Sequence, residues 1–363
     1  MSHAPTATLD ARHAALRSSL ADLGIDALVV TSRPNVIYLT NFTGSAGVVV
    51  LRPDSVQLVT DFRYVEEVEA QQRAGWACPG MALVRVDTTY DETVLASLRG
   101  CRRVGFEGGH LTVSRSRWFE RSLAGGGEWV PTDGLVEQAR LVKDAWEIGT
   151  LREAGRRLSG AARQVLASVA AGQSESDVAW HIAACLREAG FEKPAFDTIV
   201  ASGPNGALPH ARPGKRILSE GDLVVLDFGG VYDSYCVDLT RTVAIGRSSD
   251  LMRDVYEAVR DAHDRAIALV APGVSRFAID AAARECLTSW GLGEAFGHGT
   301  GHGLGIEVHE DPRIGRRRVT DVTDDPVRPG MVFTIEPGAY LPGWGGVRIE
   351  DDVVVTEAAP LVL

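Results

Sequence analysis

The residues from Gly221 to Thr242, GDLVVLDFGGVYDSYCVDLTRT, decide the fold of the longer part of this chain. An apolar run from Leu223 to Leu226 predicts one β-strand, and a second run from Val237 to Val243 predicts a returning strand. Because glycines favour tight turns, we expect Gly229 and Gly230 to open the turn between the two strands. The stretch is therefore predicted to form a β-hairpin.

Two aspartates, Asp227 and Asp238, lie inside this predicted hairpin. Strands disfavour Asp, and the burial of an unpaired carboxylate carries a large free-energy penalty. Folding about the glycines would bring the two acids opposite each other on one face. Carboxylates held that close repel each other unless a proton or a cation lies between them. The alternative is a pair of exposed aspartates at strand ends, and the hairpin alone does not decide between these interpretations.

The composition is that of an ordinary globular protein with two domains. The chain has 363 residues, of which 45% are hydrophobic and 23% are charged, so it exceeds one typical domain and can bury a large core. The net charge of −11 argues against nucleic acid or an anionic membrane as the main partner. No apolar run reaches the roughly 18–20 residues that a membrane helix needs.

The N-terminus and the cysteines predict a cytoplasmic protein. Residues 1–13 lack the basic-then-apolar pattern of a secretory signal. The cysteines are odd in number and form no CxxC pair, which predicts reduced thiols and no thiolate metal site. They are Cys78, Cys101, Cys185, Cys236 and Cys286.

The first part of the chain alternates predicted helices and strands. Helices are expected from about Leu9 to Leu23 and from Arg63 to Arg73, with a turn at Ser32 to Asn35. Apolar segments typical of strands lie at Ile25–Thr31, Gly47–Leu51, Ser55–Thr60, Leu83–Val86 and Val104–Phe106. This alternation predicts a small α/β domain, residues 1–141, followed by a second domain, residues 142–363. The segment Gly44 to Gly47 is too short for a phosphate loop and is expected to be a turn.

The second domain repeats one order of elements. A long helix ends near Gly172, a second helix begins after Ser174, and a loop with His210 leads into the hairpin. A helix from Leu251 to Val270, a helix capped by Ser275, a glycine-rich loop with histidines and another predicted hairpin follow in the same order.

The two predicted hairpins also match in detail. Gly221 stands six residues before Asp227, and Gly330 stands six residues before Glu336. In the returning strands Asp238 corresponds to Glu350. Acids at matching offsets in two similar units indicate an internal duplication with near two-fold symmetry, which would place four carboxylates around one centre.

Three histidines lie between the hairpins, in the segment FGHGTGHGLGIEVH at residues 296–309. A single histidine is more often a packed or surface residue than a ligand, but the glycines would let these imidazoles approach a centre closely. Four carboxylates and an imidazole suit two divalent ions such as Mn²⁺, Co²⁺ or Zn²⁺. A pair of such ions lowers the pKa of a shared water near neutrality, which suits hydrolysis.

These motifs carry a family resemblance. With GHGLG at 301–305 and VRIED at 347–351, the acids and histidines closely resemble those of the pita-bread metallopeptidases, which include aminopeptidase P, prolidase, methionine aminopeptidase and creatinase. YLTNFTGS at 38–45 and TDFRY at 60–64 resemble the creatinase and aminopeptidase P N-terminal domain, so the resemblance covers essentially the whole chain. It implies an α/β N-terminal domain and an α+β pita-bread catalytic domain with an internal pseudo-two-fold repeat.

The resemblance also implies a role for each site residue. The metal ligands would be Asp227 on one ion, Asp238 and Glu350 bridging both ions, and His302 and Glu336 completing the set. Glu336 would also act as the acid and base that moves the proton. The surrounding residues would be His210 on the substrate side, His309 near the reacting carbonyl, His298 as the outer histidine and Arg348 orienting the ligands. For His210 and Arg348 the alternative is a merely packed polar residue.

Among the family members, the resemblance favours two activities on proline peptides. Methionine aminopeptidases usually lack the N-terminal domain and creatinase lacks the metal ligands, which leaves Xaa-Pro aminopeptidase, which we favour, and Xaa-Pro dipeptidase (prolidase). Arg313 argues for the second, because some short prolidases carry an arginine there that could bind a dipeptide carboxylate. A surface arginine in the basic run 313–318 is the alternative. A metal-dependent lyase or a non-peptide amide hydrolase on the same fold stays open.

The resemblance sets expectations for cofactors and partners as well. We expect two divalent metal ions, with Mn²⁺ favoured and Co²⁺ or Zn²⁺ as alternatives. The expected partners are proline-containing peptides as substrates and a second copy of the chain in a homodimer, with no nucleic acid and no membrane.

Overall fold

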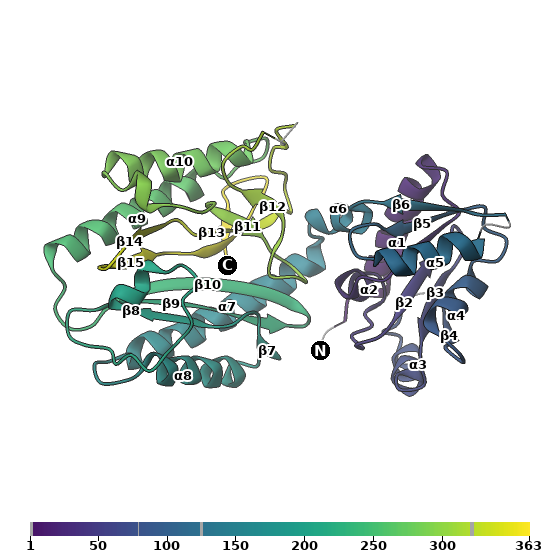
Figure 1. Cartoon of the computed structure of the whole chain (residues 1–363), viewed down its shortest axis with the longest axis horizontal. Coiled ribbons are helices and arrows are strands. Elements are labelled where there is room, and N and C mark those ends of the chain that lie inside the picture. The colour runs from purple at the N-terminus through teal and green to yellow at the C-terminus, as the bar shows by residue number, and fades with distance from the viewer. Residues whose placement is uncertain (1–2, 79, 124–125, 320–322) are drawn as a thin grey trace. The chain divides into compact units, whose positions relative to one another are not determined.

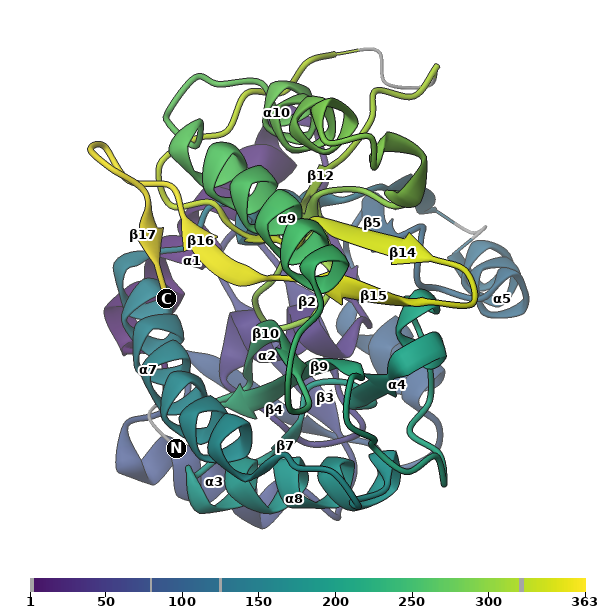
Figure 2. The same cartoon turned by 90° about the vertical axis from the view of Figure 1, so that its left-hand side faces the viewer.

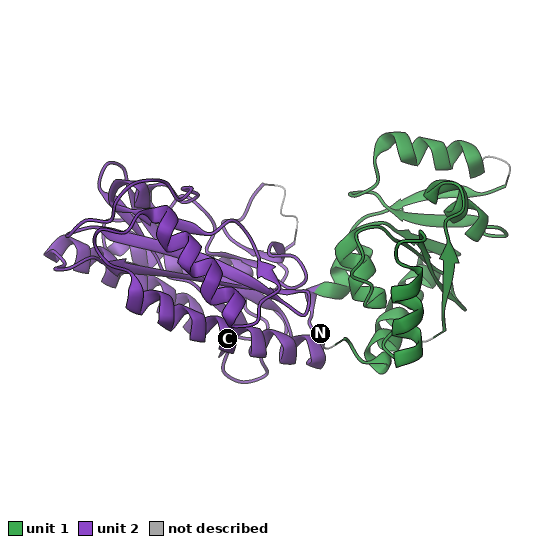
Figure 3. Ribbon diagram, turned by 90° about the horizontal axis from the view of Figure 1, so that it is seen from below, with its two compact units in different colours: residues 1–140 green, residues 141–363 purple. Residues whose placement is uncertain are grey.

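The computed structural model describes residues 3–78, 80–123, 126–319 and 323–363. The chain divides into two compact units, Met1–Arg140 and Leu141–Leu363 (Figure 3). Each unit has its own buried apolar core.

Unit 1 is an α/β domain built on one six-stranded sheet (Figure 1). In spatial order its strands are β4 (Met81–Arg85), β3 (Val56–Thr60), β2 (Val48–Leu51), β1 (Ala27–Val30), β5 (Arg103–Glu107) and β6 (Glu128–Thr132). Its helices are α1 (Thr6–Asp22), α2 (Arg33–Thr40), α3 (Val65–Ala74), α4 (Tyr90–Ser97), α5 (Val113–Leu123) and α6 (Leu135–Leu141), whose last residue falls in unit 2. The α/β class expected from the sequence is confirmed.

The segment predicted as a turn at Ser32 to Asn35 instead begins helix α2. The Ser32 side chain makes no capping hydrogen bond. The buried carboxylate of Glu107 instead fixes the two residues before the helix, because its Oε2 accepts the N–H groups of Thr31 at 2.6 Å and Ser32 at 2.7 Å. Pro34 fits the first helical turn, where its missing N–H has no intrahelical partner. The turn prediction was wrong, and these bonds from a distant strand give no local sequence signal.

The first half of unit 2 places two helices against a sheet (Figure 1). These are α7 (Ala145–Ser168) and α8 (Glu175–Glu188), and the sheet contains β7 (Lys193–Pro194), β8 (Ile199–Ser202), β9 (Leu223–Tyr232) and β10 (Tyr235–Ala244). The helix α8 begins as predicted, with a capping box between Ser174 and Asp177. Buried residues such as Leu158, Ile182 and Leu226 form the core between helices and sheet.

The second half repeats this plan on the other side of the unit (Figure 2). Its helices are α9 (Asp250–Ala268) and α10 (Arg276–Ser289), the latter capped by Ser275. Its main sheet has the order β12 (Glu310–Ile314), β11 (Gly301–Gly303), β13 (Val332–Ile335), β16 (Asp351–Val354) and β17 (Leu361–Val362). A separate pair joins β14 (Gly338–Leu341) to β15 (Gly345–Arg348).

The turn of the first hairpin lies elsewhere than the sequence predicted. Strands β9 and β10 run without a break through Gly229 and Gly230, and the chain reverses at Asp233 and Ser234, both with positive φ. Two such residues form the type of turn that matches strand twist. The glycines serve packing, since a Cβ on Gly229 would lie 2.1 Å from the Val237 carbonyl oxygen.

Two observations bear on the expected surroundings of the protein. Within the part of the chain that the structure describes, no helix is both long and apolar enough to cross a membrane. All five cysteines are buried free thiols.

Candidate metal centre

The first pair of acids lies on the long hairpin. Asp227 on β9 is paired with Thr240, and Asp238 on β10 is paired with Gly229. The two carboxylates are therefore diagonal neighbours on one face of the hairpin, not directly opposite as the misplaced turn predicted. Both are more than nine-tenths buried, so the alternative of exposed strand-end aspartates is wrong.

The second pair of acids lies where the second hairpin is interrupted. Glu336 directly follows β13, and Glu350 directly precedes β16. Pro337 has no N–H for the strand ladder, and Glu336 instead donates its own N–H to the carbonyl oxygen of Thr300 at 2.7 Å. The N–H of Glu350 donates to the carbonyl oxygen of Thr240 at 3.1 Å. This last bond joins the second half of unit 2 to the first.

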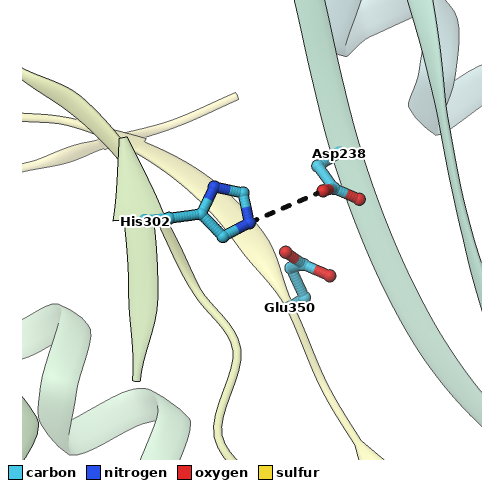
Figure 4. Close-up of side chains that lie close together, drawn as sticks. All are labelled: Asp238, His302 and Glu350. Atoms are coloured by element: carbon cyan, nitrogen blue, oxygen red, sulfur yellow. Dashed lines mark ion pairs between the residues drawn. The ribbon is translucent and has the colours of Figure 1, made fainter. Parts of the chain in front are cut away.

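His302 on β11 completes a cluster with one acid from each half. Potential ligand atoms of Asp238, His302 and Glu350 all lie within 4.8 Å of one another (Figure 4). His302 Nε2 lies 4.0 Å from Asp238 Oδ2 and 3.5 Å from Glu336 Oε1. In Figure 4 the imidazole points at the Asp238 carboxylate, with the Glu350 carboxylate beside both. The arrangement is that of groups converging on one small volume.

The carboxylates are too close to one another to be ionised together without cations. Burial, followed by the charge of Asp227, raises the pKa of Asp238 well above its ordinary value. Burial, followed by the charge of Asp238, does the same for Glu350. Burial raises the pKa of Glu336 to about 8, although the positive charge of Arg348 opposes it.

Unpaired oxygens in this cluster fit a metal. Asp227 Oδ1, Asp238 Oδ1 and Glu350 Oε1 are buried and accept no hydrogen bond from any residue that the structure describes. Buried acceptors without a donor are rare, and each is destabilising. Carboxylate oxygens combined with an imidazole suit divalent ions from Mn²⁺ to Zn²⁺. The residues present therefore fit a metal centre, and they do so without any thiolate.

The histidines around the cluster favour the neutral form. Burial, with a smaller contribution from the nearby His309, lowers the pKa of His302 to about 4. Burial also lowers the pKa of His298 to about 4 and moves that of His309 in the same direction. A neutral imidazole can bind a metal through one nitrogen or donate one hydrogen bond to a substrate.

Arg348 on β15 is the buried cation of the site. Its guanidinium pairs with Asp227, donates to Thr240 Oγ1 at 3.2 Å and donates to Tyr340 Oη at 2.8 Å. The Tyr340 hydroxyl also lies 2.8 Å from His298 Nε2. Arg348 thus touches a predicted ligand directly, and through Tyr340 it is connected to the outer histidine.

Three residues of this site escaped sequence analysis. Tyr340 and Thr240 lie in apolar strands and give no local signal. Asp352 is buried and accepts the N–H of Asp238 at 2.9 Å. The signal for Asp352 was available, because two acids, Asp351 and Asp352, stand between Glu350 and the apolar run that begins at Val353.

The predicted substrate-side histidines lie around the same centre. The rings of His302 and His309 have centroids 4.3 Å apart. His210 is exposed and close enough for its charge to lower the pKa of both His298 and His309. The structure therefore brings His309 against His302 and places His210 near both His298 and His309.

Arg313 on β12 faces this centre too. It is the direct cross-strand partner of His302, and paired residues project from the same face of a sheet. Its positive charge contributes to the lowered pKa of His302 and His309. Its side chain is exposed, and among the described residues it has no ion-pair partner. An unpaired guanidinium at this place is available to a negatively charged ligand.

Known proteins share this architecture along the whole chain. Residues 149–357 match the model of metallopeptidase family M24, and residues 12–142 match the creatinase/prolidase N-terminal domain. An Xaa-Pro dipeptidase from Bacillus anthracis has a similar structure, with a TM-score of 0.91 and 38% identity over 98% of this chain and 97% of that one.

Two further relatives carry different activities in their names. A curated Xaa-Pro dipeptidase of Pyrococcus horikoshii is 33% identical over 92% of this chain and 91% of its own. The X-Pro aminopeptidase structure from Thermotoga maritima has a TM-score of 0.85 and 33% identity over 95% of this chain and 97% of that one. The relatives therefore include both proline-specific activities.

Proposed function

Because this chain belongs to metallopeptidase family M24, we propose that it hydrolyses the bond between an N-terminal residue and proline. The supporting observation is the cluster of Asp238, His302 and Glu350, with Asp227 and Glu336 beside it, inside a ring of neutral histidines. A proline nitrogen carries no N–H, so a peptidase for this bond must hold the substrate through other groups.

Two divalent ions are the proposed cofactor. The residues that would hold these ions are Asp227, Asp238, His302, Glu336 and Glu350. Such ions supply a water molecule of lowered pKa and polarise the scissile carbonyl. The predominance of carboxylate oxygens over imidazole supports Mn²⁺ as the native metal. We also propose that the enzyme works in the cytoplasm as a homodimer.

The side chains divide the remaining work. Glu336 would take the proton of the attacking water on a carboxylate oxygen and pass it to the leaving proline nitrogen. His309 and His210 would donate hydrogen bonds to the substrate carbonyl, and the lowered pKa of His309 favours a neutral ring that keeps one N–H for this bond. Arg348 would hold Asp227 in place and keep its charge balanced.

Arg313 shifts the proposed substrate from longer peptides to dipeptides. Sequence analysis favoured an aminopeptidase, but the exposed, unpaired Arg313 guanidinium lies across the strand pair from His302. The free carboxylate of an Xaa-Pro dipeptide ends one residue beyond the scissile bond, within the reach of such a fork. We therefore propose Xaa-Pro dipeptidase as the main activity. Xaa-Pro aminopeptidase is the second candidate, which the likeness to the Thermotoga maritima enzyme supports.

The test compares Xaa-Pro dipeptides with Xaa-Pro tripeptides on the Mn²⁺-loaded enzyme. Turnover of dipeptides, with KM raised at least about 10-fold in Arg313→Leu but not in Arg316→Leu, is the expected result. Arg316 is the control because it lies in the same exposed basic run. Faster turnover of tripeptides would establish the aminopeptidase instead. A lack of turnover on both would leave a lyase or a non-peptide amide hydrolase.

A further inference from the structure

The loop that carries His210 is fastened at both ends to the start of one helix. The His210 loop is defined as residues 202–216, which are the last residue of β8 and most of the connection to β9. At its far end, the N–H of Glu175 donates to the carbonyl oxygen of Arg216 at 3.0 Å, and the N–H of Ser176 donates to the carbonyl oxygen of Gly214 at 3.0 Å. At its near end, the bonds go to the Glu175 side chain.

Glu175 is a fully buried carboxylate whose acceptor positions are filled by the His210 loop. Its Oε1 accepts the N–H of Ser202 at 2.8 Å, the hydroxyl of Ser202 at 2.7 Å and the amide of Asn205 at 2.9 Å. Its Oε2 accepts the N–H of Gly214 at 3.1 Å. A carboxylate offers about four lone-pair positions, so these four donors satisfy it. Glu175 therefore ties both ends of the loop together.

The middle of the His210 loop rests against the strand that carries Arg348. The guanidinium of Arg348 donates to the carbonyl oxygen of Pro209, the residue before His210, at 3.3 Å. The backbones of Gly206 and Gly346 touch, since a Cβ on Gly346 would lie 2.1 Å from the Gly206 carbonyl oxygen. The backbone next to His210 is thus held by Arg348, the residue that also pairs with Asp227. This contact requires the loop to keep its shape.

We propose that Glu175 is a positioning residue that holds His210 at the substrate, an inference that rests on the function proposed above for His210. The imidazole of His210 is exposed, so its own packing fixes it little. The rigidity of the loop backbone then decides where this imidazole lies. Glu175 supplies that rigidity from behind the site without touching the substrate.

The experiment uses the full chain with Glu175→Gln, which keeps the shape of the side chain but removes its charge and sets an NH₂ group against a loop donor. Asp177→Asn is the matched control, because Asp177 is an exposed acid in the same helical turn whose carboxylate bonds to Ser174 and to no other described residue. Asn205→Ala removes a single bond to Glu175 and provides a milder variant in case Glu175→Gln fails to fold. Each is also combined with His210→Ala.

Two measurements are made on each variant. The first is amide hydrogen exchange of residues 203–213 in the metal-free chain, which we expect to be at least about 10-fold faster in Glu175→Gln, less so in Asn205→Ala, and unchanged in Asp177→Asn. The second is kcat/KM on Xaa-Pro peptides, expected to fall about 10-fold in Glu175→Gln, chiefly through KM. In the His210→Ala background the same substitution should change kcat/KM less than about 2-fold.

The outcomes separate the two proposals. Unchanged exchange in both Glu175→Gln and Asn205→Ala overturns the positioning role whatever the activity. Equal losses of kcat/KM with and without His210 also overturn it, because Glu175 would then act by another route. Faster loop exchange in Glu175→Gln, together with no cleavage of Xaa-Pro peptides by the wild-type chain, supports the loop restraint and overturns the proposed function.

Discussion

The two hairpins of unit 2 deliver equivalent acids by different local structures. In the first, β9 and β10 pair without interruption, and the ladder itself fixes Asp227 and Asp238 on one face. In the second, the strands break at both acids, and the backbone N–H of Glu336 and of Glu350 donates to other parts of the unit. A repeat can thus keep the position of a ligand while changing what holds it.

The two halves of unit 2 hold their acids in different ways because one hairpin is continuous and the other is broken. The continuous hairpin is a frame that could form from local pairing. The broken hairpin takes its ligand positions from bonds to Thr300 and to Thr240, the second of which lies on the frame. Glu350 therefore depends on the first half being folded, and Asp238, whose N–H donates to Asp352, depends in turn on the second half.

Removal of one shared ligand from either half should have the largest effect. Asp238→Ala on the frame and Glu350→Ala on the broken hairpin each remove one corner of the cluster with His302. We expect turnover to fall by at least about 1000-fold in both, because each ion loses a ligand. Metal content after dialysis and kcat are the measurements. If Asp238→Ala kept both metal and turnover, the metal centre would be refuted.

A smaller effect is expected from the bond that joins the halves. The Thr240 hydroxyl donates to Glu350 Oε2 at 2.6 Å and accepts from Arg348 Nε. Thr240→Val keeps the shape and removes both bonds, which should weaken metal binding by about 10–100-fold. Thr240→Ser keeps the hydroxyl and should restore most of the affinity in a metal titration. Equal metal affinity in Thr240→Val and Thr240→Ser would show that the contact between the two halves does not depend on this hydroxyl.

Replacing one glycine in each hairpin should lower the free energy of unfolding by different amounts. On the frame, Gly229→Ala would push a methyl group into the Val237 carbonyl beside Asp238 and should destabilise the protein by about 1–3 kcal/mol. In the broken hairpin, Gly343 has φ +78° with open space around it, so Gly343→Ala should cost about 1 kcal/mol through the backbone alone. Denaturant unfolding of both variants makes the comparison, and a larger loss in Gly343→Ala would contradict it.

Sequence reasoning succeeded where the signal is local. The capping residues Ser174 and Ser275 were placed correctly, since a cap acts within one helical turn. The matching offsets of Gly221 and Gly330 before their acids correspond to two residues of positive φ, at +85° and +88°. The acids and histidines chosen from the pattern do converge in space.

It failed where a partner lies far along the chain. Gly229 and Gly230 were taken for a turn because their packing against Val237 and Phe191 is visible only in three dimensions. The start of helix α2 depends on Glu107, and the link from His298 to Arg348 runs through a tyrosine in an apolar strand. Such roles are set by tertiary contacts, and they cannot be predicted from the residue types involved.

The smallest expected effect is on the pH dependence of stability, which the buried carboxylates of both halves of unit 2 determine. In the folded, metal-free chain the pKa of Glu336 is raised from 4.5 to about 8, so the folded state holds a proton that the unfolded state has released. Stability is then lost as pH rises through this window. The lowered pKa values of His298 and His302 act oppositely, but only below their ordinary value of 6.5. Of these groups, only the carboxylates change the stability between pH 6.5 and 8, so they set the sign of its pH dependence there.

We therefore expect the metal-free protein to lose up to about 1.4 kcal/mol per pH unit for each such proton between these limits. Saturating Mn²⁺ should reverse the trend, because metal binding requires the ionised carboxylates and strengthens as they lose protons. Thermal melts with EDTA and with Mn²⁺ at both pH values measure it. Asp238→Asn and Glu350→Gln should flatten the metal-free slope equally if the halves share one charge. If the two substitutions reduced the pH dependence of stability by different amounts, one half would carry most of the repulsion between the carboxylates. The two halves would then not be electrostatically equivalent.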